Sequence, residues 1–434
     1  MAHVASNRST PTPFLESGAN RFEGNCGIDH RMEAPLKGIR VIDWTIFQQG
    51  PYATTLLADM GADVIKLEER DKGDPGRAVF AIGGADTAKK GLNFYFEANN
   101  RHKHSLTVDL RKPAAREVVY KLVEKSDVFV QNFRKGVADR LGLGYKELSA
   151  RNPKLIYASA TGYGPLGPDS GEPSFDYMGH ARSGIMLTGP ADIKDPIYLT
   201  GGIADQMGAI MLAYGVTMAL VARERYGVGQ EVNASHLGSM MALQGLNVSS
   251  RTILGHQFVR NSRDDSFNPL WNHYKCSDEQ WICLGMIQDK YWKDFCNALG
   301  IKELIDDSRF NTMKLRGRNR RELIKILDGV FLTKTRGEWM KILDEGGDFI
   351  YTVVNSVDDL PNDPQVQANE YIVDYDHPIA GKTQLMGVPV NLSRTPGNAR
   401  GRAPELGEHS ETILTELLGY SWDEVAKLRE EGAI

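Results

Sequence analysis

The sequence IRVIDWTIFQQGPYATTLLADMGADVIKLE, residues 39–68, contains two short apolar runs on either side of a stretch with helical character. The runs predict strands at 39–44 and 62–68, and Pro51 stands at the start of a helix predicted around 52–60. A strand, a helix and a strand in this order predict two parallel strands joined by a right-handed crossover.

The same alternation continues along the chain, so the sequence predicts an α/β protein with a large Rossmann-like parallel sheet covered on both faces. Further strands are predicted at 105–110, 127–132, 154–160 and 230–234, and helices at 114–125 and 205–225.

Two segments differ in character from this pattern. Residues 1–31 are polar, rich in Ser, Thr, Asn, Pro and Gly, and without apolar periodicity, so we expect a flexible N-terminal extension. The first part of the large domain is predicted at 35–235. Residues 250–350 begin with a hairpin around 277–279 and then become mainly helical, which predicts a smaller second domain.

The composition excludes several classes of protein. Of 434 residues, 41% are hydrophobic and 25% charged, which argues against long disorder or a fibrous protein. With 51 Lys and Arg against 56 Asp and Glu, the net charge is −5, and a general nucleic-acid binder is not expected. The longest strongly apolar stretch, 208–222, is shorter than the roughly 20 residues that span a bilayer, so we expect no membrane partner.

The cysteines indicate a reducing environment. Cys26, Cys276, Cys283 and Cys296 form neither a CxxC pair nor a zinc-binding spacing, so we expect free thiols. The N-terminus lacks the basic-then-apolar pattern of a signal peptide. These features predict a cytoplasmic protein.

Familiar nucleotide and metal motifs are absent or incomplete. The turn at 45–51 has one glycine and no GxGxxG, so Glu68 and Glu69 at the end of the second strand do not favour an NAD site. Residues 376–383 are a near miss for a phosphate-binding loop, but Asp376 replaces the first glycine, and we predict a turn. No HExxH, GxSxG or metal-spaced His/Cys cluster occurs, and we predict no metal site.

Two acids are candidates for a site, and each has a structural alternative. Asp205 follows Gly201 and Gly202 at the start of the long apolar helix. Its carboxylate either caps that helix or faces a ligand, and free N–H groups there can hold a developing oxyanion. Asp176 follows a Gly/Pro-rich loop and is, taken alone, an ordinary loop or cap acid.

Cationic and amide side chains follow predicted strand ends. Arg111, Arg134 and Arg140 are either solvated or available for phosphates, because open α/β sheets bind ligands at the carboxyl ends of their strands. Gln48 is either a turn residue or an amide directed into the same crevice.

Many short segments together match one enzyme family. They are 35–43 (PLKGIRVID), 50–51 (GP), 57–68 (LADMGADVIKLE), 73–75 (GDP) with Arg77, 132–133 (NF), 139–142 (DRLG), 227, 229–230 (GQ) and 403–409 (APELGEH). On these segments the chain resembles the class III CoA-transferases, the group that includes formyl-CoA:oxalate and carnitine CoA-transferases and the α-methylacyl-CoA racemases. The resemblance extends from residue 35 to the end of the chain.

The resemblance implies a fold and a reaction. A large α/β domain would be built from both chain ends, with 360–434 returning to it around the smaller inserted domain, and two ring-like chains would interlock as a dimer. Asp205 occupies the place of the family's nucleophile. It would attack an acyl-CoA and form a mixed anhydride and then an aspartyl-CoA thioester. CoA and acyl-CoA are then substrates, and no metal or tightly bound cofactor is required.

The resemblance also implies positions that bind CoA. Gln48 matches a glutamine beside the reacting acyl group, and Asp176 matches an acid close to the nucleophile. The positions implied to line the CoA site are Val108, Arg111, Asn132, Phe133, Arg140 and Leu141.

Two departures from the family pattern concern binding. Glu69 stands where the formyl-CoA enzyme has a CoA-contacting arginine, for which Arg70 is the nearest replacement. The glycine run that covers the active site in that enzyme is absent, and 266–273 (SFNPLWNH) stands near its place. The bulkier segment suggests a different substrate.

Two alternative functions remain open beside CoA transfer. The racemase relatives use a histidine at the position of Phe175, which cannot move a proton, and His180 is about one helical turn away. A non-catalytic subunit of a heteromeric CoA-transferase would be expected to lack Asp205, so its presence favours an active chain.

The substrates are open at this stage. We expect an acyl-CoA donor such as succinyl-CoA and a carboxylic acid acceptor, with an aromatic acid such as benzylsuccinate as one example. The oligomer is either a homodimer or a heteromer with a homologous subunit. Aromatic residues that either line an acceptor pocket or belong to the core are Phe47, Tyr52, Phe175, Tyr177, Trp271 and Tyr274.

Overall fold

The computed structural model describes residues 32–79, 81–82, 85–86 and 92–434. The predicted N-terminal extension at 1–31 and Cys26 lie outside the described residues. The other three cysteines are free thiols, two of them buried.

The main sheet has six parallel strands in the order β5-β2-β1-β6-β7-β8. Their bounds are β1 (Arg40–Trp44), β2 (Asp63–Glu68), β5 (Lys103–Thr107), β6 (Val128–Gln131), β7 (Ile156–Thr161) and β8 (Gln230–Ser235). Counted in chain order, this is the 3-2-1-4-5-6 arrangement of Rossmann folds. The order reverses between β1 and β6, and a crevice for a ligand is expected at the carboxyl ends of these two strands.

Helices cover both faces of the sheet because the strands are apolar on both sides. On β1, Val41 packs with the face covered by α1 (Gln49–Asp59) and α7 (Ile203–Tyr226), whereas Ile42 packs with the opposite face. The opposite face is covered by α3 (Pro113–Glu124), by α5 (Tyr145–Arg151) and by the end of the chain.

The C-terminal segment belongs to this core. It comprises α15 (Ser410–Thr412), a π-helical turn at Ile413–Leu417 and α16 (Trp422–Glu430), and it buries Leu414 and Val425 against the sheet. The chain end therefore packs on the sheet that the first half of the chain forms.

A second unit has its own core. Its three-stranded antiparallel sheet is β9 (Trp271–Lys275), β10 (Trp281–Gly285) and β11 (Tyr351–Val353), and the hairpin predicted around 277–279 joins the first two strands. Helices α10 (Trp292–Leu299), α12 (Arg320–Phe331) and α13 (Arg336–Gly346) share its core, and α11 (Met313–Arg318) contacts α12.

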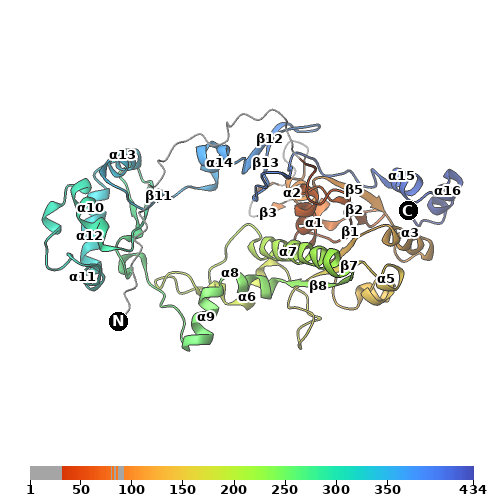
Figure 1. Ribbon diagram of the computed structural model, residues 1–434, viewed down its shortest axis with the longest axis horizontal. Coiled ribbons are helices and arrows are strands. Elements are labelled where there is room, and N and C mark those ends of the chain that lie inside the picture. The colour runs from red at the N-terminus through yellow and green to blue at the C-terminus, as the bar shows by residue number, and fades with distance from the viewer. Residues whose placement is uncertain (1–31, 80, 83–84, 87–91) are drawn as a thin grey trace, which may run out of the picture.

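Two separate stretches of chain connect the units, and the ribbon forms an open ring (Figure 1). One passes through α8 (His236–Leu243) and α9 (Gly245–Leu254), and the other through α14 (Pro364–Ala368) and the hairpin of β12 (Ile372–His377) and β13 (Gly381–Met386). That hairpin contains the turn predicted at 376–383. The domain boundaries themselves stay a prediction.

Helix α7 is longer than predicted. It spans 24 residues and ends at Gly227, which adopts the left-handed conformation. Among the described residues it is the one helix with the length and apolar composition of a membrane span. In this fold it packs against α1 and β8 as a helix of the sheet's core, which accounts for the apolar residues on its buried face.

Candidate active site

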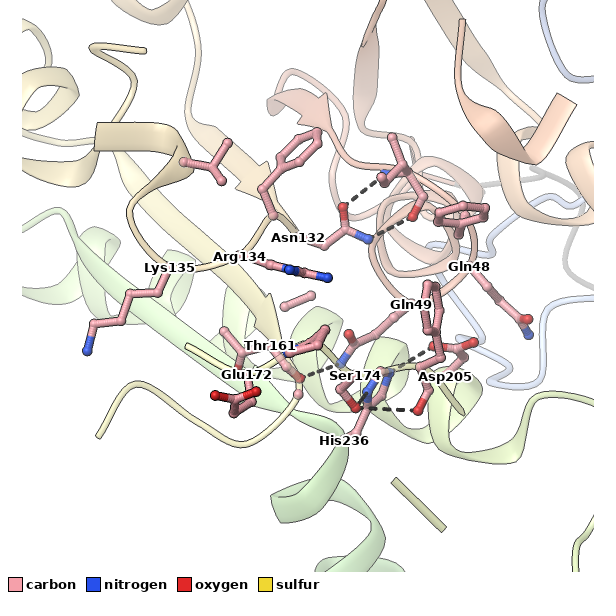
Figure 2. Close-up of a pocket in the computed structure, with 18 of the residues that line it drawn as sticks. Gln48, Gln49, Asn132, Arg134, Lys135, Thr161, Glu172, Ser174, Asp205 and His236 are labelled. Atoms are coloured by element: carbon pink, nitrogen blue, oxygen red, sulfur yellow. Dashed lines mark hydrogen bonds and ion pairs between the residues drawn. The ribbon is translucent and has the colours of Figure 1, made fainter. Parts of the chain in front are cut away.

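A cavity of about 390 Å³ lies at the carboxyl ends of β1 and β6, where the strand order reverses. It is lined by the loop after β1 (46–49), by the loop after β6 (132–135), and by Ser174, Asp205 and His236 (Figure 2). The polar groups thus come from five separate parts of the chain and meet at the edge of the sheet that the topology predicts.

Asp205 lies in the first turn of α7. Gly201 and Gly202 precede the helix with φ angles of 100° and 70°, a region that favours glycine and allows the sharp entry into α7. The Asp205 side chain is only 16% exposed, yet it lines the cavity. The position combines limited access for water with access for a ligand.

Asp176 holds the start of α7. It begins α6 (Asp176–Ser183), and its Oδ1 accepts hydrogen bonds from the backbone N–H groups of Ala204 (2.7 Å) and Asp205 (3.1 Å). Its Oδ2 accepts from the Tyr198 hydroxyl at 2.8 Å. Burial and this bond raise the pKa of Tyr198 to about 12, so its hydroxyl stays protonated. Asp176 does not line the cavity, and the two N–H groups that it binds are not available to an oxyanion.

His236 is a residue of the site that the sequence reasoning missed. It is the first residue of α8, directly after β8, and its side chain is 4% exposed. Its Nε2 lies 2.8 Å from Oδ1 of Asp205, and its Nδ1 lies 3.1 Å from Oγ of Ser174. A Cβ on Gly179 would lie 2.9 Å from the His236 Cβ, so this close packing requires glycine. The available signal was its position at the carboxyl end of a strand.

Gln48 lies against the start of α7. A Cβ on Gly202 would lie 2.5 Å from the Gln48 Nε2, so the amide sits directly over that glycine, beside Asp205 (Figure 2). Gln49, which was not predicted, also lines the cavity. Within the described residues, no acceptor pairs the backbone N–H groups of Gln48, Gln49 and Gly50.

Asn132 fixes the loop that carries Gln48. Its amide donates to the Ile46 carbonyl at 2.7 Å and its Oδ1 accepts from the Ile46 N–H at 2.9 Å. This pair of bonds joins the loop after β6 to the loop after β1, across the point where the strand order reverses. The next residue, Phe47, has a φ of 64° and donates its N–H to Oδ1 of Asp74 at 3.0 Å.

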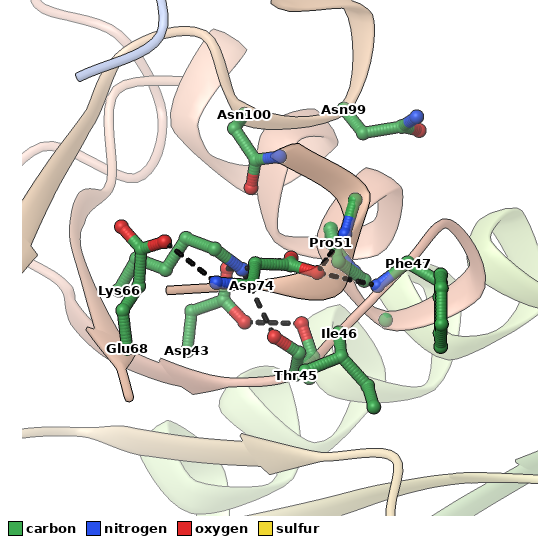
Figure 3. A network of polar contacts seen from close by, with 12 residues as sticks. Asp43, Thr45, Ile46, Phe47, Pro51, Lys66, Glu68, Asp74, Asn99 and Asn100 are labelled. Atoms are coloured by element: carbon green, nitrogen blue, oxygen red, sulfur yellow. Dashed lines mark hydrogen bonds and ion pairs between the residues drawn. The ribbon is translucent and has the colours of Figure 1, made fainter. Parts of the chain in front are cut away.

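A buried network of charged side chains contacts the loop after β1 (Figure 3). Lys66 donates to the Thr45 carbonyl and pairs with Oδ2 of Asp74, both at 2.9 Å, and Lys103 pairs with Oδ2 of Asp43 at 2.8 Å. Burial alone would raise the pKa of Asp43, but Lys103 and Lys66 outweigh it and hold that pKa at about 2.

A second cavity of about 540 Å³ adjoins the first and shares Ile46, Phe133 and Val137 with it. Four of the positions implied for CoA binding line this second cavity: Val108, Arg111, Phe133 and Leu141. The three shared residues thus form a wall common to both cavities, and Asp205 lines the first of them.

The charges around the second cavity differ from the expectation. Glu69 lines it and accepts from the backbone N–H groups of Asp71 and Lys72, and Lys72 is a lining residue. Arg70 does not line the cavity and bonds Asp71 instead, so Lys72 is the nearby cation. Arg111 lines the cavity with a largely exposed side chain and forms two bonds with Asp109.

Three further cations lie near the first cavity. Arg134 and Lys135 line it, and within the described chain Arg134 has no acidic partner. Arg140 ends α4 (Val137–Arg140) and lines neither cavity.

The aromatic candidates fall into separate groups. Phe47 and Phe175 line the first cavity with ring centroids 5.8 Å apart, whereas Tyr274 is buried in the second unit's core. Trp271 is exposed on β9, Tyr177 is exposed on α6, and Tyr52 is half-buried on α1. The described residues contain no cluster of three or more metal-binding side chains.

Comparison with known proteins identifies the family. The pattern described as CoA-transferase family III matches residues 36–410. The chain is 33% identical to a succinyl-CoA:glutarate CoA-transferase of Mus musculus, over 98% of this chain and 96% of the relative. It is also 33% identical to a succinyl-CoA–D-citramalate CoA-transferase of Chloroflexus aurantiacus, over 93% and 99%. A solved CAIB/BAIF family structure from Brucella suis superposes with a TM-score of 0.78 at 29% identity, covering 89% of this chain and 100% of that one.

Proposed function

Since the chain belongs to CoA-transferase family III, we propose that it moves CoA from succinyl-CoA to a second carboxylic acid through a thioester on Asp205. The observation that carries this proposal is the position of the Asp205 carboxylate. It lines the cavity, has one oxygen hydrogen-bonded to His236, and has its other oxygen without a donor in the described chain. That second oxygen is available as a nucleophile.

The reaction needs only carboxylates and a thioester. Oδ2 of Asp205 attacks the thioester carbonyl, and CoA leaves as the thiolate. The thiolate then attacks Cγ of Asp205 and releases the donor acid, which leaves an aspartyl-CoA thioester. The acceptor carboxylate repeats these steps in reverse order. The overall exchange is nearly level in energy, because one CoA thioester of a carboxylic acid replaces another, and exclusion of water from the cavity limits hydrolysis of the more reactive anhydride.

The two adjoining cavities supply a place for CoA. The nucleotide end of CoA fits the second cavity beside Lys72 and Arg111. The thioester end passes Phe133, which lines both cavities, and reaches Asp205. Arg134 and Lys135 line the first cavity and are available to neutralise the phosphates. Gln48 and Gln49 line the cavity, and their backbone N–H groups, which have no acceptor within the described residues, are available to the donor's acyl oxygen as it develops charge.

We place the acceptor among dicarboxylic acids. Glutarate and D-citramalate, the acids named for two relatives, both carry a second carboxylate. Phe47 and Phe175 add an apolar wall beside Asp205, which suits an acceptor with an apolar or aromatic substituent such as benzylsuccinate.

A second copy of the chain is part of the proposal. On α7, Ile210, Tyr214, Met218 and Val221 follow one another at intervals of three or four residues and are each 45–58% exposed. This spacing places them on one face of the helix. An exposed apolar face of this length indicates a contact with another protein surface. The ring-shaped ribbon supports the interlocked dimer that the resemblance implies (Figure 1). Light scattering coupled to size-exclusion chromatography tests the mass.

The test of the function is trapping of the intermediate. The pure protein is mixed with succinyl-CoA, quenched with hydroxylamine and digested, and the peptides are weighed. A hydroxamate on the Asp205 peptide in the wild type, and its absence in Asp205→Ala with CoA binding retained, is the expected result. No adduct with succinyl-CoA or other acyl-CoAs would overturn the proposal.

The same samples separate the alternatives. Exchange of the α-hydrogen of a 2-methylacyl-CoA with deuterated water would indicate an epimerase. Activity that returns only with a co-purifying homologue would indicate a heteromer. Acceptors are then compared in one panel: glutarate, D-citramalate and benzylsuccinate.

A further inference from the structure

We infer that His236 donates the hydrogen bond that stabilises the negative charge on Asp205 each time the Asp205 Cγ is attacked. The inference rests on the proposed function, because it concerns the steps of the same reaction. Its starting point is one contact, the 2.8 Å separation between Nε2 of His236 and Oδ1 of Asp205.

The direction of this hydrogen bond follows from the chemistry of the two groups. An ionised carboxylate only accepts hydrogen bonds, so Nε2 of His236 carries the hydrogen. In the neutral imidazole Nδ1 is then an acceptor, and the Ser174 hydroxyl at 3.1 Å is placed to donate to it. Ser174 thereby favours the tautomer that points an N–H at Asp205. The imidazole is almost completely enclosed, which makes its orientation fixed.

The bond also distinguishes the two oxygens of Asp205. Because Oδ1 is held by His236, Oδ2 is the oxygen free to attack the donor thioester. In the mixed anhydride, Oδ2 bridges the two acyl groups and Oδ1 is the carbonyl oxygen of the aspartyl half. Oδ1 therefore remains beside Nε2 when the covalent intermediate forms.

Charge then appears on Oδ1 twice in each turnover. When the CoA thiolate adds to Cγ, the C=O electron pair moves onto Oδ1, and collapse expels the donor acid as a carboxylate that carries Oδ2. When the acceptor carboxylate later adds to the thioester at Cγ, the electron pair again moves onto Oδ1, and collapse expels the CoA thiolate. No proton is transferred in either step, and the His236 N–H lies next to the charge in both.

Two of the nearest backbone donors already have another partner. Backbone N–H groups at the start of α7 are the nearest alternative, but those of Ala204 and Asp205 are bonded to Asp176. In the part of the chain that the structure describes, no other side chain donates to the Asp205 carboxylate. His236 is thus the one side chain of the described chain that contacts Oδ1 as a donor.

The experiment compares two substitutions of similar size that differ in one N–H group. In the full-length protein, His236→Gln keeps a side-chain N–H of comparable reach, and His236→Met removes it. Because loss of one oxyanion donor costs roughly 100-fold to 1,000-fold in rate, we expect His236→Met to lower kcat about 100-fold. We expect His236→Gln to recover at least about tenfold of that loss, with the KM for succinyl-CoA little changed in both variants.

A single-turnover measurement locates the effect. Formation of the aspartyl-CoA thioester on mixing with succinyl-CoA, and its consumption by the acceptor, should both slow in His236→Met, because both pass through attack at Cγ. Ser174→Ala should show a smaller loss, since it removes only the partner of Nδ1. His104→Gln is the matched control, because His104 lies on β5 at the end of the strand away from the cavities.

The outcomes separate this inference from the proposed function. The role of His236 is overturned if the Asp205 thioester forms and wild type, His236→Gln and His236→Met react at equal rates. It is also overturned if the two variants differ from wild type only by an equal rise in KM. A wild-type protein that forms no thioester and converts no acceptor overturns the proposed function itself. Thermal unfolding and CoA binding by calorimetry verify that each variant is folded. If His236→Met does not fold, His236→Gln is compared with His236→Ala, and a higher kcat in His236→Gln supports the role of His236.

Discussion

Asp176 binds the backbone of Asp205: its Oδ1 accepts the Asp205 N–H at 3.1 Å and the neighbouring Ala204 N–H at 2.7 Å. The first N–H groups of a helix have no partner within the helix, and the helix dipole makes this end attractive to a negative charge. The carboxylate that begins α6 therefore fixes where α7 starts, and with it the direction in which the Asp205 side chain leaves the helix.

This contact predicts a difference between two substitutions. Asp176→Ala leaves two N–H groups unpaired in a largely buried place, so we expect a loss of about 1–3 kcal/mol in the free energy of unfolding and at least a tenfold lower kcat. Asp176→Asn keeps an acceptor oxygen and should recover most of the stability. Urea unfolding and the transfer assay measure both, with the exposed Asp192→Ala as control. Equal stability of the Ala variant and wild type would contradict the capping role.

The sheet was predictable because parallel strands buried on both faces are continuous apolar runs. The predicted strands at 39–44 and 62–68 agree with β1 and β2 to within one residue. The strand predicted at 105–110 is found as β5 at Lys103–Thr107. Lys103 is fully buried and pairs with Asp43, so a charged residue lies inside the strand because of a partner 60 positions away. Local patterning contains no such information.

Less of the active site than of the sheet was predictable from the sequence. The resemblance implied Asp205 as the nucleophile, Gln48 beside the acyl group and Phe133 at a CoA position, and all three line the first cavity. The pairing of His236 with Asp205 joins two residues 31 positions apart and depends on how α7 and α8 pack. No single motif carries that packing, and a histidine at the end of a strand is by itself unremarkable in sequence.

The cations near the cavities should differ in their effect on CoA binding. Arg134 lines the first cavity without an acidic partner in the described chain, whereas Arg140 lines neither cavity. We expect Arg134→Ala to raise the KM for acyl-CoA roughly tenfold, and Arg140→Ala to raise it less, with kcat little changed in both. Steady-state kinetics at two salt concentrations measure this, since the Arg134 contribution should shrink at high salt. A larger effect from Arg140 would reverse the assignment.

The buried charge network predicts a pH dependence of stability. Burial raises the pKa of Asp43, but Lys103 and Lys66 lower it further, to about 2 from an ordinary value of 3.8. A carboxyl group with a lowered pKa stabilises the fold above its unfolded pKa, and this contribution is lost as the pH falls through the folded pKa. The window is therefore about pH 4 to pH 2, and the contribution is about 2 kcal/mol.

The measurement compares wild type with Asp43→Asn, which lacks this titration. The difference in the free energy of unfolding between the two proteins should shrink by about 2 kcal/mol between pH 5 and pH 2. Urea unfolding followed by circular dichroism at several pH values gives the two curves. Parallel curves over this range would show that Asp43 titrates alike in the folded and unfolded states.

The last prediction concerns Phe47, which has a φ of 64°. A residue with a Cβ is strained by about 1 kcal/mol in this left-handed region, and glycine is not. Asn132 and Asp74 hold the backbone on either side through bonds to Ile46 and Phe47, so the loop cannot relax to another conformation. Phe47→Gly should therefore unfold at higher urea than Phe47→Ala, the reverse of the order expected at most positions.

Both variants lose the ring that lines the cavity and should show similar, reduced kcat, so the pair separates backbone strain from contact with the substrate. If Phe47→Ala is the more stable of the two, the loop adjusts its backbone and the network around Asp74 does not hold it.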